Sequence, residues 1–199
     1  QVYFIDNEEY FPSKMMFHDA EGNFMRNNDE RMIFYCKGVI ETVRKLGWAP
    51  DVIHCQGWFS SLVPMYIKKI FSEEPLFDNV KIIYSVFDNG FRGALSNSLV
   101  EKLLFENLQE KELSRLRKPT VNNLHKFAID YSDAVVQASP VIEKDVLSHI
   151  KSSGKPFMQY PGDENYINSY QNFYQQFFSE SEDCVEIEEE PEKIVLTEN

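Results

Sequence analysis

The sequence predicts an α/β fold built on a mostly parallel sheet with helices on both faces. Short runs rich in β-branched and aromatic residues alternate with segments whose apolar residues recur at helical spacing. This alternation is typical of parallel sheets, because each parallel crossover needs a connection about as long as a helix. With 199 residues, 43% of them hydrophobic, the chain can bury a sizeable core within one domain.

Five strands are predicted along the chain. They lie at 2–6, 52–56, 80–86, 134–138 and 157–160. The run at 80–86 has the strongest strand composition, and the glycine-punctuated loop at 87–93 ends it. Residues 7–28 are polar, aromatic and irregular, which indicates a long loop or a flap.

Six helical segments fill the intervals. They lie at 28–46, 59–71, 96–119, 120–131, 139–153 and 163–177. Asn27 and Glu30 form a predicted capping box for the first, and Pro64 predicts a kink or a late start in the second. The third is weakly patterned and is interpreted as an insertion whose charged run is exposed. Thr120 and Ser139 are the predicted caps of the fourth and fifth.

Charge is concentrated at the end of the chain. The net charge is −12, and the residues from Glu180 to Asn199 hold nine acidic side chains and one lysine. We therefore expect a domain over 1–178 and an acidic, solvated tail over 179–199, with a docking role for the tail as the alternative. The mildly acidic body has no basic patch of the kind that binds nucleic acid.

Three distant cysteines, Cys36, Cys55 and Cys184, match neither a disulfide framework nor a zinc spacing. We expect Cys36 and Cys55 to be reduced packing residues in a cytoplasmic protein. No apolar run approaches a membrane span in length, so no membrane partner is expected. Because a strand-like run follows Gln1 at once, the chain is expected to be a cut or processed piece.

Polar residues end two of the predicted strands. His54 and Gln56 follow one apolar run and lead into Trp58, and Asp88 and Asn89 follow the next. The carboxyl ends of parallel strands line the ligand crevice of such sheets, so these five residues are candidate substrate-binding residues. Their hydrogen-bonding groups and the flat indole suit a polyhydroxylated ligand.

Structural roles remain open for each candidate. His54 can be a satisfied core histidine, Trp58 a core anchor and Asp88 a turn residue. His125 and His149 lie on predicted helices and are interpreted as surface residues. The histidines show no metal spacing, and the usual nucleotide-binding and nucleophile motifs are absent.

Five segments carry a family resemblance in a shared order. They lie at 2–11, 28–34, 50–58, 82–88 and 123–140. Within the third, Pro-Asp-Val-Ile-His-Cys-Gln-Gly-Trp is similar to Pro-Asp-Val-Val-His-Ala-His-Asp-Trp of bacterial glycogen synthases and plant starch synthases, glycosyltransferase family 5. Together the segments cover most of residues 1–160.

The resemblance implies the N-terminal-type domain of a GT-B fold, in which two Rossmann-like domains enclose the active site. Members of the family transfer glucose from ADP-glucose to the 4-hydroxyl at the end of an α-1,4-glucan, without a metal or another cofactor. The implied partners are therefore α-glucan and ADP-glucose, which the crevice wall would face.

The chain departs from the family pattern at positions that lie near the active site in the family. Gln56 stands where the family has its second histidine, and Gly57 where it has an acid. Phe87 and Asp88 stand where it has histidine and asparagine, and its donor-binding Lys-x-Gly-Gly-Leu loop would precede Gln1. No residue is assigned a catalytic role, and without the second domain the isolated chain is expected to be inactive, which leaves a second polypeptide as a potential partner.

Two functions follow as hypotheses. The first is a glycogen or starch synthase-like glycosyltransferase domain. The second is a non-catalytic carbohydrate-binding or regulatory module derived from that family.

Overall fold

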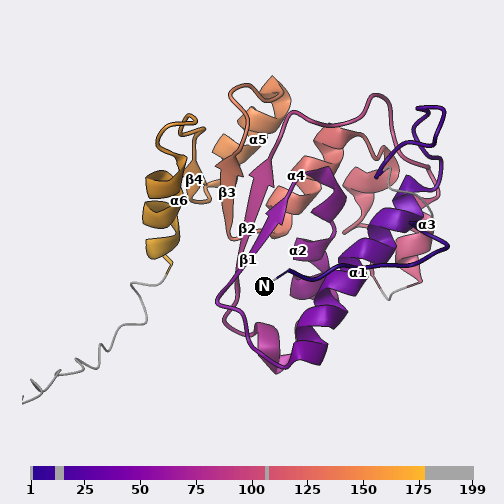
Figure 1. The fold of residues 1–199 in the computed structure, drawn as a ribbon, viewed down its shortest axis with the longest axis horizontal. Coiled ribbons are helices and arrows are strands. Elements are labelled where there is room, and N and C mark those ends of the chain that lie inside the picture. Colours follow the sequence, from indigo (N-terminus) through magenta and orange to yellow (C-terminus); the bar gives the residue numbers. More distant parts are fainter. Residues whose placement is uncertain (1, 12–15, 106–107, 178–199) are drawn as a thin grey trace, which may run out of the picture. The chain divides into compact units, whose positions relative to one another are not determined.

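A computed structural model describes residues 2–11, 16–105 and 108–177 of the chain. Within these residues one sheet has the strand order β1–β2–β3–β4, and all neighbouring strands are parallel (Figure 1). The strands are β1 (Val52–Gln56), β2 (Lys81–Val86), β3 (Ala134–Gln137) and β4 (Phe157–Met158). The predicted α/β class and parallel sheet are confirmed.

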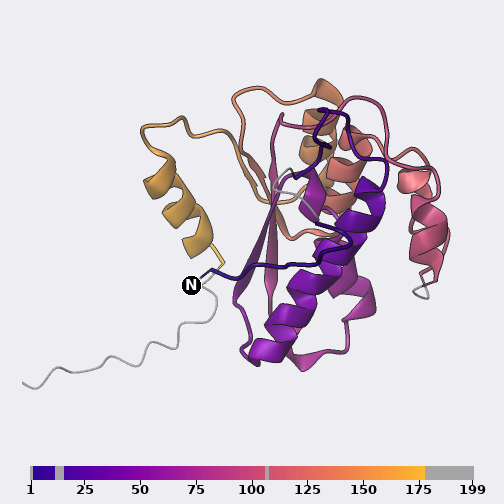
Figure 2. The ribbon, with the colours of Figure 1, turned by 45° about the vertical axis from the view of Figure 1, so that its right-hand side comes forward.

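Helices connect the strands and form the core with them. They are α1 (Asn28–Leu46), α2 (Val63–Met65), α3 (Leu99–Leu104), α4 (Val121–Tyr131), α5 (Lys144–Ser153) and α6 (Tyr166–Gln175). Helix α4 packs against both α2 and α5, and Figure 2 shows α4 and α5 on the same side of the sheet. Successive right-handed crossovers to the next strand place their helices on one face.

The chain divides into two compact units, Gln1–Glu164 and Asn165–Asn199. The second contains α6, on which the Phe173 ring is buried and contacts Phe177 edge to face. The predicted tail at 179–199 lies outside the described residues, and the predicted domain limit at 178 stays a prediction.

The predicted strand at 2–6 is wrong. Residues 2–6 take no strand conformation, and Val2 and Phe4 are 76% and 91% exposed. A strand needs a neighbouring backbone, and this segment pairs with none in the described part of the chain. Instead Ile5 packs so closely on α1 that a Cβ at Gly38 would lie 3.3 Å from its side chain.

Helix starts follow the predictions only in part. Thr120 caps α4 by accepting a hydrogen bond from Asn123 N, and the segment after β1 becomes α-helical only near Pro64, as predicted. The Asn27 side chain makes no capping bond. Helix α5 begins at Lys144 because the Ser139 hydroxyl is engaged elsewhere, accepting from Asp88 N at 3.1 Å.

The segment at 96–119 is more buried than its pattern suggests. Leu99 and Leu103 on α3 are fully buried, and so are Leu113 and Leu116 after the charged run. The expected exposure of the charged run is wrong for Leu113 and Leu116, because their apolar side chains join the main core.

Candidate functional site

The two polar strand ends meet, as parallel pairing requires. Gly57 N donates to Ser85 O at 3.0 Å, which extends the β1–β2 pairing beyond Gln56. A Cβ at Gly57 would lie 3.9 Å from the Phe87 ring and 4.0 Å from Asn89 Oδ1. Gly57 also has φ +71°, a conformation that L side chains rarely adopt. Glycine at this position therefore allows the chain to turn directly against the second strand end.

His54 is held as a neutral, internal group. Its Nε2 lies 2.7 Å from Ser85 Oγ on the neighbouring strand. Burial lowers the pKa of His54 to about 4, because a charged imidazole is poorly solvated there. The ring and the exposed Gln56 line a hollow of about 280 Å³. His54 is thus hydrogen-bonded to the neighbouring strand and is uncharged at neutral pH.

Trp58 is a buried aromatic residue, 3% exposed. Its ring centroid lies 4.8 Å from Phe17, 4.8 Å from Phe91 and 5.1 Å from Phe59. These rings cover the indole, so it offers no open flat face to a sugar. Trp58 does reach the wall of a hollow of about 370 Å³ that Asn89 also lines.

Asp88 and Asn89 are exposed at the end of β2 but border different hollows. Asp88 lines a larger hollow of about 840 Å³ on the side of α4 and α5. Residues 90–92 border both hollows. The five sequence-predicted residues therefore lie on or just after two neighbouring strands, but they are divided among three hollows, and only the hollows of Asp88 and Asn89 share lining residues within the described part of the chain.

His125 is a residue that the sequence interpretation misplaced. It is 2% exposed, and its Nδ1 lies 2.8 Å from the Tyr84 hydroxyl, which also bonds Gly57 O at 3.0 Å. Burial lowers the pKa of His125 to about 4, with a smaller opposing effect of the Phe87 backbone. The sequence did contain a sign of this burial. His125 follows the apolar Val121 by four residues on α4, and residues four apart share a helix face.

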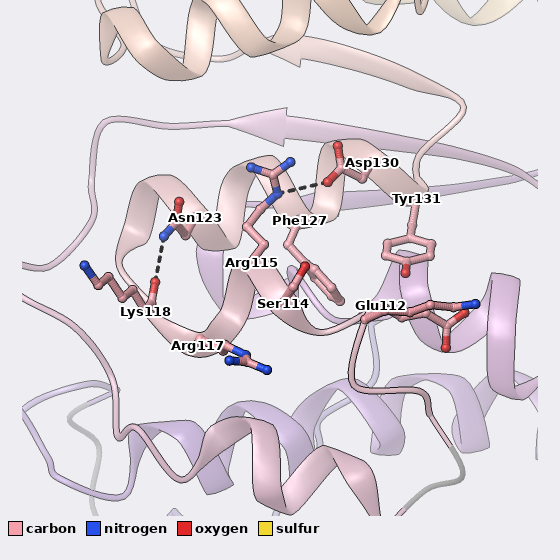
Figure 3. A pocket seen from close by; sticks show the side chains of 10 residues that line it. Glu112, Ser114, Arg115, Arg117, Lys118, Asn123, Phe127, Asp130 and Tyr131 are labelled. Atoms are coloured by element: carbon pink, nitrogen blue, oxygen red, sulfur yellow. Dashed lines mark hydrogen bonds and ion pairs between the residues drawn. The ribbon is translucent and has the colours of Figure 1, made fainter.

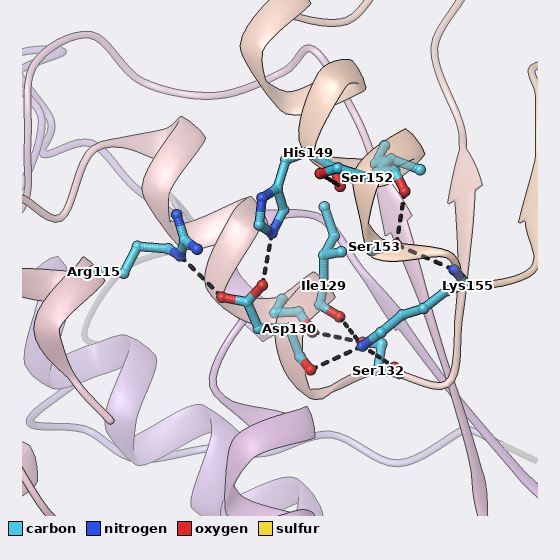
Figure 4. Close-up of polar contacts among 10 residues, drawn as sticks. Arg115, Ile129, Asp130, Ser132, His149, Ser152, Ser153 and Lys155 are labelled. Carbon is cyan, nitrogen blue, oxygen red and sulfur yellow. Dashed lines mark hydrogen bonds and ion pairs between the residues drawn. The ribbon is translucent and has the colours of Figure 1, made fainter. Parts of the chain in front are cut away.

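A separate polar region lies near the end of α4. A hollow of about 650 Å³ is lined by basic residues of 111–118 and by the end of α4, and Figure 3 shows Arg115 bonded to Asp130 there. Asp130 also binds His149 Nε2 at 2.6 Å, and the Lys155 ammonium donates to the carbonyls of Ile129, Asp130 and Ser132 (Figure 4). These contacts tie the end of α4 to α5, and none of the predicted site residues takes part.

His149 is correspondingly less exposed than a free surface residue, with 21% of its side chain accessible. The described residues contain no group of three or more His, Cys, Asp or Glu side chains placed to hold a metal ion. None of the helices in the described ranges is both long and apolar enough to cross a membrane.

Comparisons with known proteins agree on one family. The model of the starch synthase catalytic domain matches residues 1–156. Glycogen synthase of Chlorobium luteolum is 38% identical over 109 residues, covering 54% of this chain and 22% of that protein. Glycogen synthase of Chlorobaculum parvum is 33% identical over 158 residues, covering 77% of this chain and 31% of that protein. The chain thus spans less than a third of the length of these relatives.

A solved structure shares the fold. It is the catalytic domain of starch synthase IV from Arabidopsis thaliana bound to ADP and acarbose, with a TM-score of 0.54 and 19% identity over 69% of this chain and 30% of that one. The chain belongs to the starch synthase catalytic domain family.

Proposed function

We propose that this chain supplies one wall of a glucan-synthase active site, where an α-1,4-glucan end and ADP-glucose bind. The family reaction is transfer of glucose from ADP-glucose to the 4-hydroxyl of the glucan end. The observation that carries the proposal is the exposed polar edge formed by Gln56, Asp88 and Asn89 where β1 and β2 end side by side. Amide and carboxylate groups there can hydrogen-bond sugar hydroxyls.

The same edge supplies groups that can bind a sugar, but His54 and Gln56 are poorly suited to general acid or base catalysis. His54 is neutral and paired with Ser85, and Gln56 cannot titrate. The chain also spans 22% to 31% of its glycogen synthase relatives. Efficient transfer normally requires a closed site that excludes water, so the 199-residue chain alone is expected to bind sugars without elongating glycogen.

Two further assignments belong to this proposal. A second polypeptide that completes the active site is the partner that would restore transfer. The compartment is the cytoplasm, a proposal supported by Cys36 and Cys55, both of which are free and buried.

Calorimetry of the chain with maltotetraose and with ADP-glucose tests the binding wall. The sequence supplies a matched control, because Phe-Asp-Asn occurs both before β2 (77–79) and after it (87–89), with Asp and Asn exposed in each case. The pair Asp88→Ala and Asn89→Ala should weaken binding about tenfold, as expected for lost hydrogen bonds. The pair Asp78→Ala and Asn79→Ala should leave it unchanged.

Equal effects of the two double variants would contradict the site. Absence of heat with both sugars would contradict the proposed function itself. Robust incorporation of labelled glucose into glycogen by the chain alone would overturn the expectation that it is inactive.

A further inference from the structure

The hollow of about 650 Å³ between α4 and the short helical segment Ser114–Arg117 is lined largely by basic side chains. Lys111, Arg115, Arg117 and Lys118 bring four positive charges to its wall, and it is termed the basic hollow. None of its described lining residues also lines a hollow of the candidate site. It is therefore a separate place on the surface.

The two acidic side chains of this wall are each paired with a cation. Asp130 Oδ2 accepts a hydrogen bond from Arg115 Nε at 3.0 Å, and Glu112 Oε1 lies 2.8 Å from Lys69 Nζ. Paired carboxylates repel an incoming anion much less than free ones, because the charge of the partner cancels theirs at a distance.

The remaining cations leave the basic hollow with a surplus of positive charge. Arg117 forms an ion pair with Glu110, which stands beside the wall. Lys111 and Lys118 form no ion pair of their own among the residues that the structure describes. Three pairs and two additional lysines therefore give a local net charge of about +2 in a chain whose net charge is −12. A surplus of this sign attracts an anion.

The two arginines are held in place and keep further donors for a ligand (Figure 3). A guanidinium has five N–H donors, and Arg115 uses its Nε on Asp130 while Arg117 uses one Nη on Glu110. Asp130 is itself bonded to His149 Nε2 at 2.6 Å, which fixes the position of Arg115. Side chains that are already ordered lose less conformational entropy when a ligand binds.

Neutral side chains supply more donors and an apolar surface. The Asn123 amide donates to Lys118 O at 2.8 Å and so ties the basic segment to the first turn of α4. Burial raises the pKa of Tyr131, so its hydroxyl stays protonated and can donate to an anion. The Phe127 ring adds apolar wall, and the volume lies within the range of about 300–1,000 Å³ that is usual for small-molecule sites.

We propose that the basic hollow binds a small phosphate-bearing ligand, and that Arg117 and Lys118 make the main contacts to the phosphate. The Arg117 side chain is 63% exposed and Arg115 only 33%, so Arg117 is the arginine that an anion reaches more easily. Its planar fork can bind two phosphate oxygens, and the Lys118 ammonium adds a point charge. This site goes beyond the proposed function, because no group of the sugar-binding edge takes part in it.

Calorimetry with inorganic pyrophosphate tests these contacts. Arg117→Gln combined with Lys118→Gln removes two charges from the basic hollow and should weaken pyrophosphate binding about tenfold. Arg26→Gln combined with Lys45→Gln removes the same two kinds of charge from exposed positions outside the hollow, and it should leave the affinity unchanged. Equal weakening by the two double variants would overturn the site, because net charge alone would then explain binding.

NMR of the wild-type chain locates the ligand without depending on a variant that folds. With ¹⁵N-labelled arginine, the Nε–H resonances of Arg115 and Arg117 should move when pyrophosphate is added. The resonance of Arg44, which bonds Glu74 instead, should stay in place. Sodium chloride at the same ionic strength should move none of them. Unmoved Arg115 and Arg117, or equal movement of Arg44, would overturn the proposal.

The result is independent of the proposed function. Maltotetraose binding should be the same for the wild type and for the variant that lacks Arg117 and Lys118. Maltotetraose binding without pyrophosphate binding would overturn the phosphate site and leave the proposed function intact. Pyrophosphate binding with no heat from maltotetraose or ADP-glucose would support the phosphate site and reject the proposed function.

Discussion

The Tyr84 hydroxyl lies 2.8 Å from Nδ1 of His125 and connects β2 to α4 inside the core. The same hydroxyl bonds Gly57 O at 3.0 Å, where the chain leaves β1. One phenol therefore joins a strand, a helix and the turn that begins the candidate site. Hydrogen bonds buried at low local dielectric are stronger than the same bonds in water, so they hold these elements together.

Removal of that hydroxyl should destabilise the fold. Tyr84→Phe keeps the ring but takes a partner from His125 Nδ1 and from Gly57 O, so the free energy of unfolding should fall by about 1–3 kcal/mol. Urea denaturation measures the change. Tyr166→Phe, at a residue that is 53% exposed, is the control and should change stability by less than about 0.5 kcal/mol. Equal free energies of unfolding for the two variants would show that the hydrogen bonds of the Tyr84 hydroxyl do not stabilise the fold.

Stability should fall in mild acid because two histidines are buried in the neutral form. Burial lowers the pKa of both His54 and His125 to about 4, from the 6.5 that is usual for histidine. The unfolded chain therefore binds protons first, so stability is complete above the unfolded pKa and declines as pH falls toward 4. Between about pH 7.5 and about pH 5 each histidine should lower the free energy of unfolding by about 2 kcal/mol.

Denaturation of wild type and His54→Gln at several pH values checks this linkage. The variant cannot bind the proton, so its stability should decline less steeply than that of the wild type by the share of one histidine. Parallel pH profiles would rule out a buried neutral His54.

The loop after β2 should tolerate no side chain at Gly90. A Cβ there would lie 2.6 Å from Val121 Cγ1 and 2.7 Å from Cγ2, so the loop rests directly on the first turn of α4. Gly90→Ala should lower the free energy of unfolding by about 1–3 kcal/mol through overpacking. Combination with Val121→Ala should recover most of that loss in thermal denaturation, because the clashing methyl groups are gone. Simple additivity of the two changes would contradict the close approach.

Lys155 should stabilise the end of α4. Its ammonium donates to the carbonyls of Ile129, Asp130 and Ser132, where a helix leaves carbonyls without partners and favours a positive charge (Figure 4). Lys155→Met should lower the free energy of unfolding by about 1–3 kcal/mol. Lys151 is exposed, so Lys151→Met is the control and should lower the free energy of unfolding by less than about 0.5 kcal/mol. Similar losses at both lysines would exclude this role.

Local signals predicted much of the fold because they report interactions between residues near in sequence. The apolar composition of β2 and the Thr120 cap of α4 needed no distant partner to be recognised. The late helix start near Pro64 follows from the covalent ring of that residue alone. The predicted strand at 2–6 failed for the opposite reason, since a strand exists only beside another backbone.

The candidate site shows the same division. The sequence by itself determined the family resemblance and the positions of His54, Gln56, Asp88 and Asn89 at two strand ends, because strand composition and chain order are local properties. Only the tertiary structure decided that rings from distant segments cover Trp58 and that His125 lies buried against Tyr84. Burial depends on which remote segments pack over a side chain, and a single residue's sequence neighbours do not contain that information.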